Sequence, residues 1–318
     1  MKKGMDDQMF ISTVSNQLIS IFLIMLVGYL LTKWKLLGDE VVKGLSMLLS
    51  FVGLPASVIS GMQVPYSREL LGQFGTIVLG FTCVTFIGIA ITIPVCMLRR
   101  IPLGESGAWI NCVALTNCIF VGRPIMMAIY GDTASFPITA LIFSFNILTF
   151  SIGIFLVSLG GNVSVREALG QMPRRLLNPT VIAGFVGLAF FLLSVRLPAP
   201  VINTLDMLGA INTPLSMLVI GYSLALIKPI ELFNDLRVYI VAALRLLVCP
   251  VVALLVLGLF IHDPVLLGIL VLVSAMPTAS IIGVLSEQYN SHPAFCSKAV
   301  FLTTLLCFLT IPLIARLL

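Results

Sequence analysis

The stretch TNCIFVGRPIM, residues 116–126, decides the fold because it interrupts an otherwise apolar run that is long enough to form a membrane helix. It contains an asparagine, a glycine, an arginine and a proline within eight positions. Pro124 cannot donate a backbone hydrogen bond and clashes with the carbonyl group one turn earlier, while Gly122 weakens the helix further. The pattern therefore predicts a helix that is broken near mid-membrane.

The composition places this break in a membrane protein. Of the 318 residues, 59% are hydrophobic and 10% are charged, and the mean hydropathy is +1.14. Soluble domains carry roughly a quarter charged residues, so a soluble enzyme of this length is excluded. The net charge of +5 resides in short loops between apolar runs, which is typical of membrane topology and not of a nucleic-acid partner.

The apolar runs predict an all-α polytopic protein with ten transmembrane helices, because only helices satisfy their own backbone in lipid over such lengths. The approximate spans are 10–32, 42–61, 70–97, 104–130, 134–158, 176–195, 199–226, 236–261, 264–289 and 295–317.

The positive charges predict how these spans are oriented. Eleven of the eighteen lysines and arginines fall in or beside the odd-numbered loops, five lie on the other side, and two are inside spans. The positive-inside rule predicts a multi-pass protein of the cell membrane with both termini extracytoplasmic.

Two halves of the chain share one pattern of prolines. Four prolines have a partner in the second half at offsets of 153 to 159 residues: Pro55 and Pro214, Pro94 and Pro250, Pro124 and Pro277, and Pro137 and Pro293. Each half has five spans, an odd number, so the second half enters the membrane from the opposite side. We predict two inverted repeats, 1–160 and 176–318, joined by a cytoplasmic linker at 161–175.

The counterpart of the opening stretch is SAMPTAS, residues 274–280, where Ser274, Thr278 and Ser280 flank Pro277. Broken helices at matching positions of inverted repeats indicate a substrate site, because the ends of half-helices offer free N–H groups and a partial positive charge. Asn117 can donate and accept hydrogen bonds there. Two helices that are merely kinked are the structural alternative.

Arg123 and Arg245 are the two charges predicted to lie inside spans. Neither has an obvious deep carboxylate partner in the sequence, so each is a candidate ligand for an organic acid. The alternatives are that they extend to the interface or cap the carbonyl groups of a broken helix. The nearest carboxylate for proton coupling is Asp206, early in the seventh span.

The chain resembles the auxin efflux carrier family, which includes bacterial malate and malonate carriers. The matching stretches, in order, are LPASVISG at 54–61, TNCIFVGRP at 116–124, NP at 178–179, TPLSMLVIG at 213–221, RLLVCP at 245–250 and SAMPTAS at 274–280. The resemblance implies that helices four and nine cross at their broken centres. It also implies that helices 1, 2, 6 and 7 form a scaffold, and that helices 3–5 and 8–10 form a transport domain that moves as an elevator.

The resemblance also assigns site residues. Asn117, Gly122 and Pro124 match the motif of the fourth span, and Met276 and Pro277 match that of the ninth. Together with Arg123, Ser274, Thr278 and Arg245 they are the predicted substrate-binding residues. Arg123 between the glycine and the proline is not expected of other members, which leaves the substrate open.

The sequence thus predicts a secondary transporter of small organic anions, mono- or dicarboxylates, and not an enzyme. The alternatives are a sodium-coupled carrier of the bile acid transporter type, a non-transporting membrane sensor and an intramembrane enzyme. No catalytic or metal-binding cluster is present: the seven cysteines form no CxxC pair, and His262 and His292 are far apart. No cofactor is expected, coupling to Na⁺ or H⁺ stays open, and the expected partners are the substrate, the lipid bilayer and a second copy in a homodimer.

Overall fold

The computed structural model describes residues 2–161, 177–226 and 235–317, together with residues 166, 167, 170 and 173, and side chains from residue 16 onward. Throughout these residues the secondary structure is helical, apart from one isolated β-bridge, so the predicted all-α class is confirmed. Seven helices are long and apolar enough to cross a membrane. The linker predicted at 161–175 lies mostly outside the described residues.

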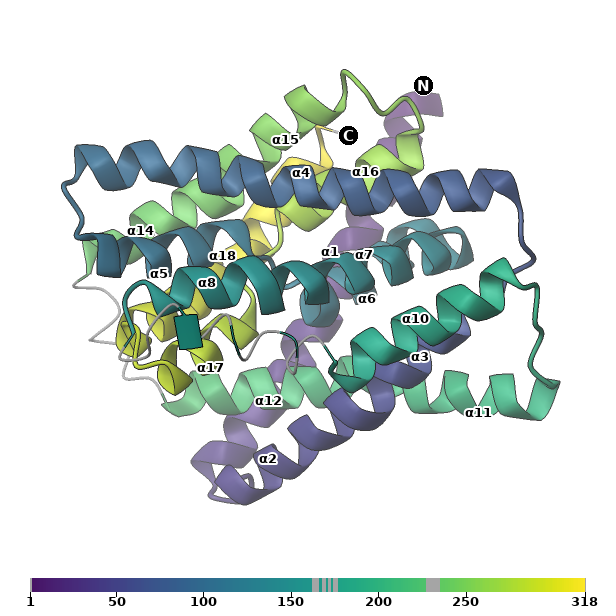
Figure 1. Ribbon diagram of the computed structural model, residues 1–318, viewed down its shortest axis with the longest axis horizontal. Helices are drawn as coiled ribbons and strands as arrows, with labels where there is room; N and C mark the ends of the chain where they lie inside the picture. The colour runs from purple at the N-terminus through teal and green to yellow at the C-terminus, as the bar shows by residue number, and fades with distance from the viewer. Residues whose placement is uncertain are drawn as a thin grey trace.

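Figure 1 labels the helices and colours them from purple at the N-terminus to yellow at the C-terminus. The first half contains α1 (Lys2–Lys33), α2 (Asp39–Leu48), η1 (Leu49–Gly53), α3 (Leu54–Gly61), α4 (Arg68–Leu98), α5 (Leu103–Ala114), η2 (Cys118–Gly122), α6 (Arg123–Tyr130), η3 (Gly131–Ala134), α7 (Ser135–Leu148), η4 (Thr149–Gly153) and α8 (Ile154–Ser158). The second half contains α10 (Pro179–Leu192), α11 (Ala199–Ala210), α12 (Asn212–Leu226), α14 (Leu236–Ala243), η5 (Leu244–Val248), α15 (Cys249–Leu257), α16 (Pro264–Ser274), α17 (Ser280–Gln288) and α18 (Pro293–Ala315).

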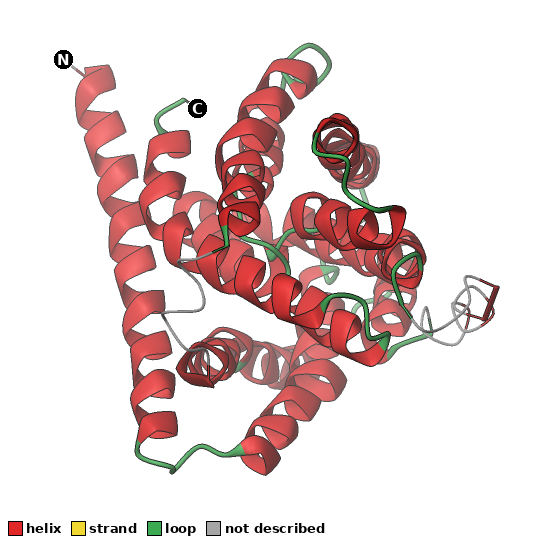
Figure 2. Ribbon diagram, turned by 90° about the vertical axis from the view of Figure 1, so that its left-hand side faces the viewer, coloured by secondary structure: helices red, strands yellow, loops and turns green. Residues whose placement is uncertain are grey.

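Two groups of helices have many contacts among their own members, and the groups also touch each other where α1 meets α6 and where α7 meets α3 and α10. The helices α1 and α12 run along each other, and α3 packs against both α10 and α11. In the other group α4 contacts α5, α7, α15 and α16, while α18 contacts α14 and α17. Figure 2 shows the long α1 along one edge of the molecule.

The contact between α1 and α12 is close because both helices present glycine to the partner. A Cβ atom on Gly28 would lie 2.5 Å from the carbonyl oxygen of Leu218, and one on Gly221 would overlap the carbonyl oxygen of Met25. The obstructing atoms belong to backbone inside helices and cannot rotate away. Small residues at such positions let membrane helices approach closely.

We expect Gly28→Ala to destabilise the protein by about 1–3 kcal/mol, because the added methyl group forces α1 away from α12. The measurement is the melting temperature of the purified protein in detergent. The matched control is Gly72→Ala in α4, where an added Cβ meets no atom within 4 Å. There the better helix propensity of alanine should leave stability unchanged or slightly higher. Equal melting temperatures for the two variants would contradict the proposed role of Gly28.

Three of the prolines that matched between the halves follow a π-helical turn. The turns η1, η2 and η5 each end two residues before a proline, namely Pro55, Pro124 and Pro250. In each turn a backbone N–H donates to the carbonyl five residues earlier, as from Arg123 to Cys118. The wider turn accommodates a ring that would clash with the preceding α-helical turn. A proline that predicts a break from sequence can therefore remain within a helix.

The break in the fourth predicted span lies earlier than we predicted. The helix is interrupted at 115–117, which we call the first break, and runs without a gap from Cys118 to Tyr130. Gly122 and Pro124 lie within this continuous part because the π turn accommodates the proline. The second break, 275–279, includes Pro277 as predicted.

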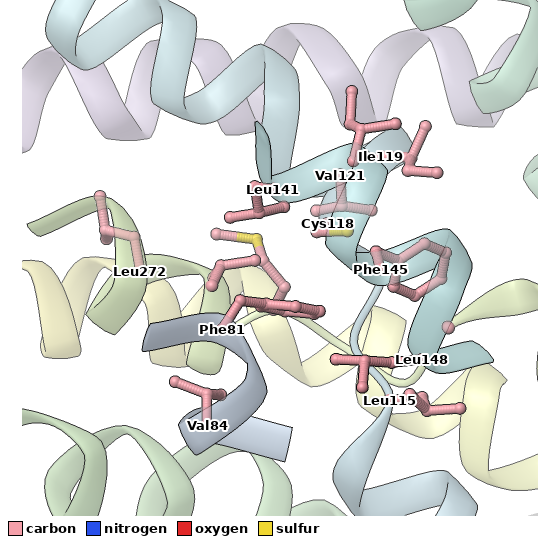
Figure 3. Close-up of a cluster of buried hydrophobic side chains, with 14 of the residues drawn as sticks. Phe81, Val84, Leu115, Cys118, Ile119, Val121, Leu141, Phe145, Leu148 and Leu272 are labelled. Carbon is pink, nitrogen blue, oxygen red and sulfur yellow. The ribbon is translucent and has the colours of Figure 1, made fainter. Parts of the chain in front are cut away.

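Apolar side chains surround the first break on several sides. Figure 3 shows side chains from α4, α7, α16 and the break itself gathered in one cluster: Phe81, Val84, Leu115, Cys118, Leu141, Phe145, Leu148 and Leu272. All of them are buried. This packing fixes the unwound backbone between rigid helices and keeps lipid away from its polar groups.

Candidate functional site

The two breaks bind each other through their backbones. The N–H of Asn117 donates to the carbonyl of Pro277 over 2.7 Å, and the N–H of Ala279 donates to the carbonyl of Leu115 over 3.0 Å. These bonds form one antiparallel β-bridge in the middle of a helical protein. Each break thereby satisfies backbone groups that lost their helical partners. The structure thus brings the two predicted breaks together.

Two threonines reinforce this contact in a reciprocal manner. The hydroxyl of Thr116 donates to the carbonyl of Val273 over 2.8 Å, and that of Thr278 donates to the carbonyl of Cys112 over 2.7 Å. Val273 and Cys112 lie at the C-terminal ends of α16 and α5, where carbonyl groups have no partner within the helix. Each break therefore caps the half-helix that leads into the other break.

Arg245 completes the capping of both half-helices. It is fully buried in η5 and donates to the carbonyl groups of Val113, Val273 and Met276 at 2.7, 3.2 and 2.9 Å. The carboxyl ends of α5 and α16 carry partial negative charge, which the guanidinium group offsets. Of the three interpretations of Arg245, these contacts and its burial favour the cap of a broken helix over a ligand for substrate or an extension to the interface.

Arg123 lies elsewhere. It is the first residue of α6, is partly buried, and is not among the residues that line the two cavities described below. The carboxylate of Asp206 in α11 attracts it electrostatically, and the hydroxyl of Ser60 donates to the same carboxylate. The sequence did not indicate that Asp206 interacts with Arg123, because the two residues are far apart in the chain.

A cavity of about 150 Å³ lies beside the place where the two breaks, 115–117 and 275–279, bind each other, which we call the crossing. Its walls come from the π turns η1, η2 and η4 or their ends, from α7 and from three helix N-termini. None of the lining residues is charged. They are Ser50, Leu54, Asn117, Ile119, Phe120, Phe145, Asn146, Thr149, Phe150, Asn178, Pro179, Thr180, Ala279, Ser280 and Ile281. Such π turns often occur at functional sites.

Three helices begin at this cavity. Asn117 caps the helix that starts with η2, where its Oδ1 accepts from the N–H of Phe120 over 3.2 Å. Asn178 caps α10 in the same way, and α17 begins at Ser280. The Nδ2 of Asn117 also donates to the hydroxyl of Ser280 over 3.0 Å, which ties two of the helix starts together. Helix N-termini attract anions, so their convergence gives an uncharged cavity a positive potential.

Most of the predicted site residues support the crossing and do not line the cavity. Of the nine, Asn117 lines it. Ser274 donates to the carbonyl of Val271 in its own helix, and Met276 is fully buried against Gly122. Pro124, Pro277 and Thr278 are also buried at or near the crossing.

Sequence reasoning missed several lining residues, notably Asn178, Asn146 and Thr149. A signal for Asn178 was present, because asparagine followed by proline is typical of an N-cap and first helical residue. No comparable signal marks the other two, whose place on the cavity depends on the packing of α7.

A second cavity of about 720 Å³ adjoins the first and shares Ser50, Phe120, Ser280 and Ile281 with it. It extends to the first residue of α2, the last of α12 and the end of α17, where Asp39, Leu226 and Glu287 line it. The two cavities therefore share part of their walls between these helix ends and the crossing.

Comparison with known proteins agrees with this architecture. The chain is 26% identical to a Rhizobium meliloti protein named "Putative malonate transporter", over 94% of this chain and 93% of the relative. It is 24% identical to an "Uncharacterized transporter" of Methanothermobacter thermautotrophicus, over 94% and 96% of the two chains. The family described as membrane transport protein matches residues 13–315, nearly the whole chain. This protein is therefore a multi-pass membrane protein that belongs to the membrane transport protein family, the family of the auxin efflux carriers.

Proposed function

We propose that the protein is a secondary transporter that moves small organic anions, mono- or dicarboxylates, across the cell membrane. The observation that carries this proposal is the convergence of three helix N-termini on one uncharged cavity beside the crossing. The dipoles of helix N-termini attract a carboxylate without a cationic side chain. Attraction of the anion by several helix dipoles is weaker than an ion pair with one cationic side chain, and this suits a carrier, which must release the anion that it binds.

We further propose that the carrier works as an elevator built from two inverted five-helix repeats. The reciprocal threonine caps at the crossing support the repeat, because each half supplies the same kind of bond to the other. The pairing of α1 with α12 and of α3 with α10 and α11 supports a scaffold of helices 1, 2, 6 and 7, and the contacts of α4 with α5, α7, α15 and α16 support a moving domain of the remaining six. The cavity lies between them, with Ser50 and Asn178 from the scaffold and Asn117 and Ser280 from the moving domain.

The second cavity supports an orientation for this carrier. Its outer residues lie at the ends of helices beside the first, seventh and ninth loops, which the positive-inside rule places in the cytoplasm. In this proposal the structure is open to the cytoplasm and both termini are extracytoplasmic. Cysteine labelling from either side of the membrane at the chain ends tests this orientation.

The proposed activity is tested with purified protein and a panel of organic acids. Malonate is the first probe, since it is a small dicarboxylate and the name of one relative refers to it. We expect at least one small mono- or dicarboxylate to raise the melting temperature, and the same acid to exchange across proteoliposomes. A concentration of one hundred times the dissociation constant stabilises the folded state by about 2.7 kcal/mol.

The outcomes separate the alternatives. Binding without any exchange would indicate a membrane sensor, and chemical conversion of the acid would indicate an enzyme. Exchange that requires sodium would indicate a carrier of the bile acid transporter type, whereas collapse of uptake with the pH gradient would indicate proton coupling. If no organic acid either stabilises the protein or crosses the membrane, the proposed function is wrong.

A further inference from the structure

Thr149 is an unusual residue of the cavity. It begins η4, it is 1% exposed, and it lines the cavity beside the crossing. Its hydroxyl makes no hydrogen bond to any described protein atom. A buried hydroxyl without a partner is unfavourable, so its retention at this place calls for an explanation.

Most other helical threonines among the described residues avoid the problem. Nine of them in the described helices donate to the carbonyl four residues earlier: Thr32, Thr76, Thr82, Thr85, Thr92, Thr139, Thr204, Thr303 and Thr304. The polar neighbours of Thr149 do the same, since Asn146 donates to Ile142 and Ser151 donates to Ile147. At Thr149 the helix changes to a π turn, and the hydroxyl makes no such bond.

We propose that the hydroxyl of Thr149 donates a hydrogen bond to the transported anion and selects anions that carry a second acceptor group. This inference rests on the proposed function. A carboxylate attracted by the helix N-termini lies in the same cavity that Thr149 of η4 lines. A second carboxylate or a hydroxyl oxygen on the same small molecule reaches this donor, while an alkyl end leaves it unpaired. Sites built to hydrogen-bond a polar group reject analogues that lack it.

The test compares malonate with propionate, which has the same number of carbon atoms and a methyl group in place of one carboxylate. Binding is measured by calorimetry and by thermal shift on wild type, Thr149→Val and Thr149→Ser. We expect Thr149→Val to lose roughly ten- to a hundredfold in malonate affinity, as for hydrogen bonds to charged groups, with propionate affinity unchanged or higher. Thr149→Ser, which keeps the hydroxyl, should bind malonate nearly as wild type does.

A matched control is available in α18. The hydroxyl of Thr310 is also buried without a partner, but Thr310 lines neither cavity. Thr310→Val should leave both affinities unchanged. Without ligand, Thr149→Val should melt at the wild-type temperature or higher, because it removes an unpaired buried hydroxyl. A hydroxyl with a structural partner would give the opposite change in the empty protein.

Three results would overturn this inference: wild-type affinity of Thr149→Val for malonate, a lower melting temperature of that variant without ligand, or a wild-type protein that prefers propionate. Each of these results is compatible with binding of an organic acid by the wild type, so the proposed function survives. Absence of binding by wild type to any acid in the panel would overturn both.

Discussion

Asn117→Asp should abolish transport while the protein stays folded. Aspartate caps a helix as well as asparagine does, and the hydroxyl of Ser280 can donate to it, so the local bonds persist. The new carboxylate, however, places a negative charge in the cavity that attracts anions. Two like charges about 4 Å apart repel by about 4 kcal/mol at an effective dielectric constant of 20, equivalent to roughly a thousandfold loss of affinity. The measurement is the binding and exchange of the best acid from the panel.

The control is Asn203→Asp, on an exposed part of α11 that lines neither cavity. It adds the same charge without placing it near the anion and should leave exchange unchanged. Asn117→Asp should melt within a few degrees of wild type. Wild-type exchange by Asn117→Asp would show that anions do not bind beside the crossing.

Arg245→Met should impair folding more than any other single change described here. It removes three charged hydrogen bonds and leaves the carbonyl groups of Val113 and Met276 without the guanidinium donor, while Val273 keeps its bond from Thr116. Each buried carbonyl left without a donor costs about 1–3 kcal/mol. We expect a lower yield of monodisperse protein and a lower melting temperature, measured by size-exclusion chromatography and thermal unfolding.

The second intramembrane arginine provides the matched comparison. Arg123→Met should have a smaller effect, because Asp206 is exposed and retains its hydrogen bond from Ser60. Arg245→Lys keeps the charge but not the forked geometry, so its stability should fall between those of wild type and Arg245→Met. If Arg245→Met melted as wild type and lost only anion binding, Arg245 would be a ligand instead of a cap.

Asn117 could be predicted as a site residue because its chemistry is local. A polar amide next to glycine and proline within an apolar run indicates an unwound segment whatever the rest of the chain does. The position of that segment could not be predicted, because a proline can be accommodated either by a break or by a π turn. In this protein Pro124 follows a π turn, and the break lies at 115–117, where it pairs with the second break.

The two arginines could likewise be predicted as unusual from the sequence, whereas their roles depend on the tertiary structure. From sequence, each was either a ligand or a structural contact, because a guanidinium group serves both purposes equally well. Arg245 caps two helices whose ends are 132 and 28 residues away along the chain. Arg123 lies near an aspartate of another helix. Spacing in the sequence does not encode contacts of this range.

The sequence by itself determined the helical class, the number of apolar runs and the two proline-containing stretches, because hydropathy and helix interruption depend on neighbouring residues. The tertiary structure decided which polar groups became caps and which line the cavity. Asn178 and Thr149 reach that cavity only through the packing of α10 and α7 around the crossing. The physical reason is that the role of a buried polar group depends on its partner, and at the crossing those partners come from distant helices.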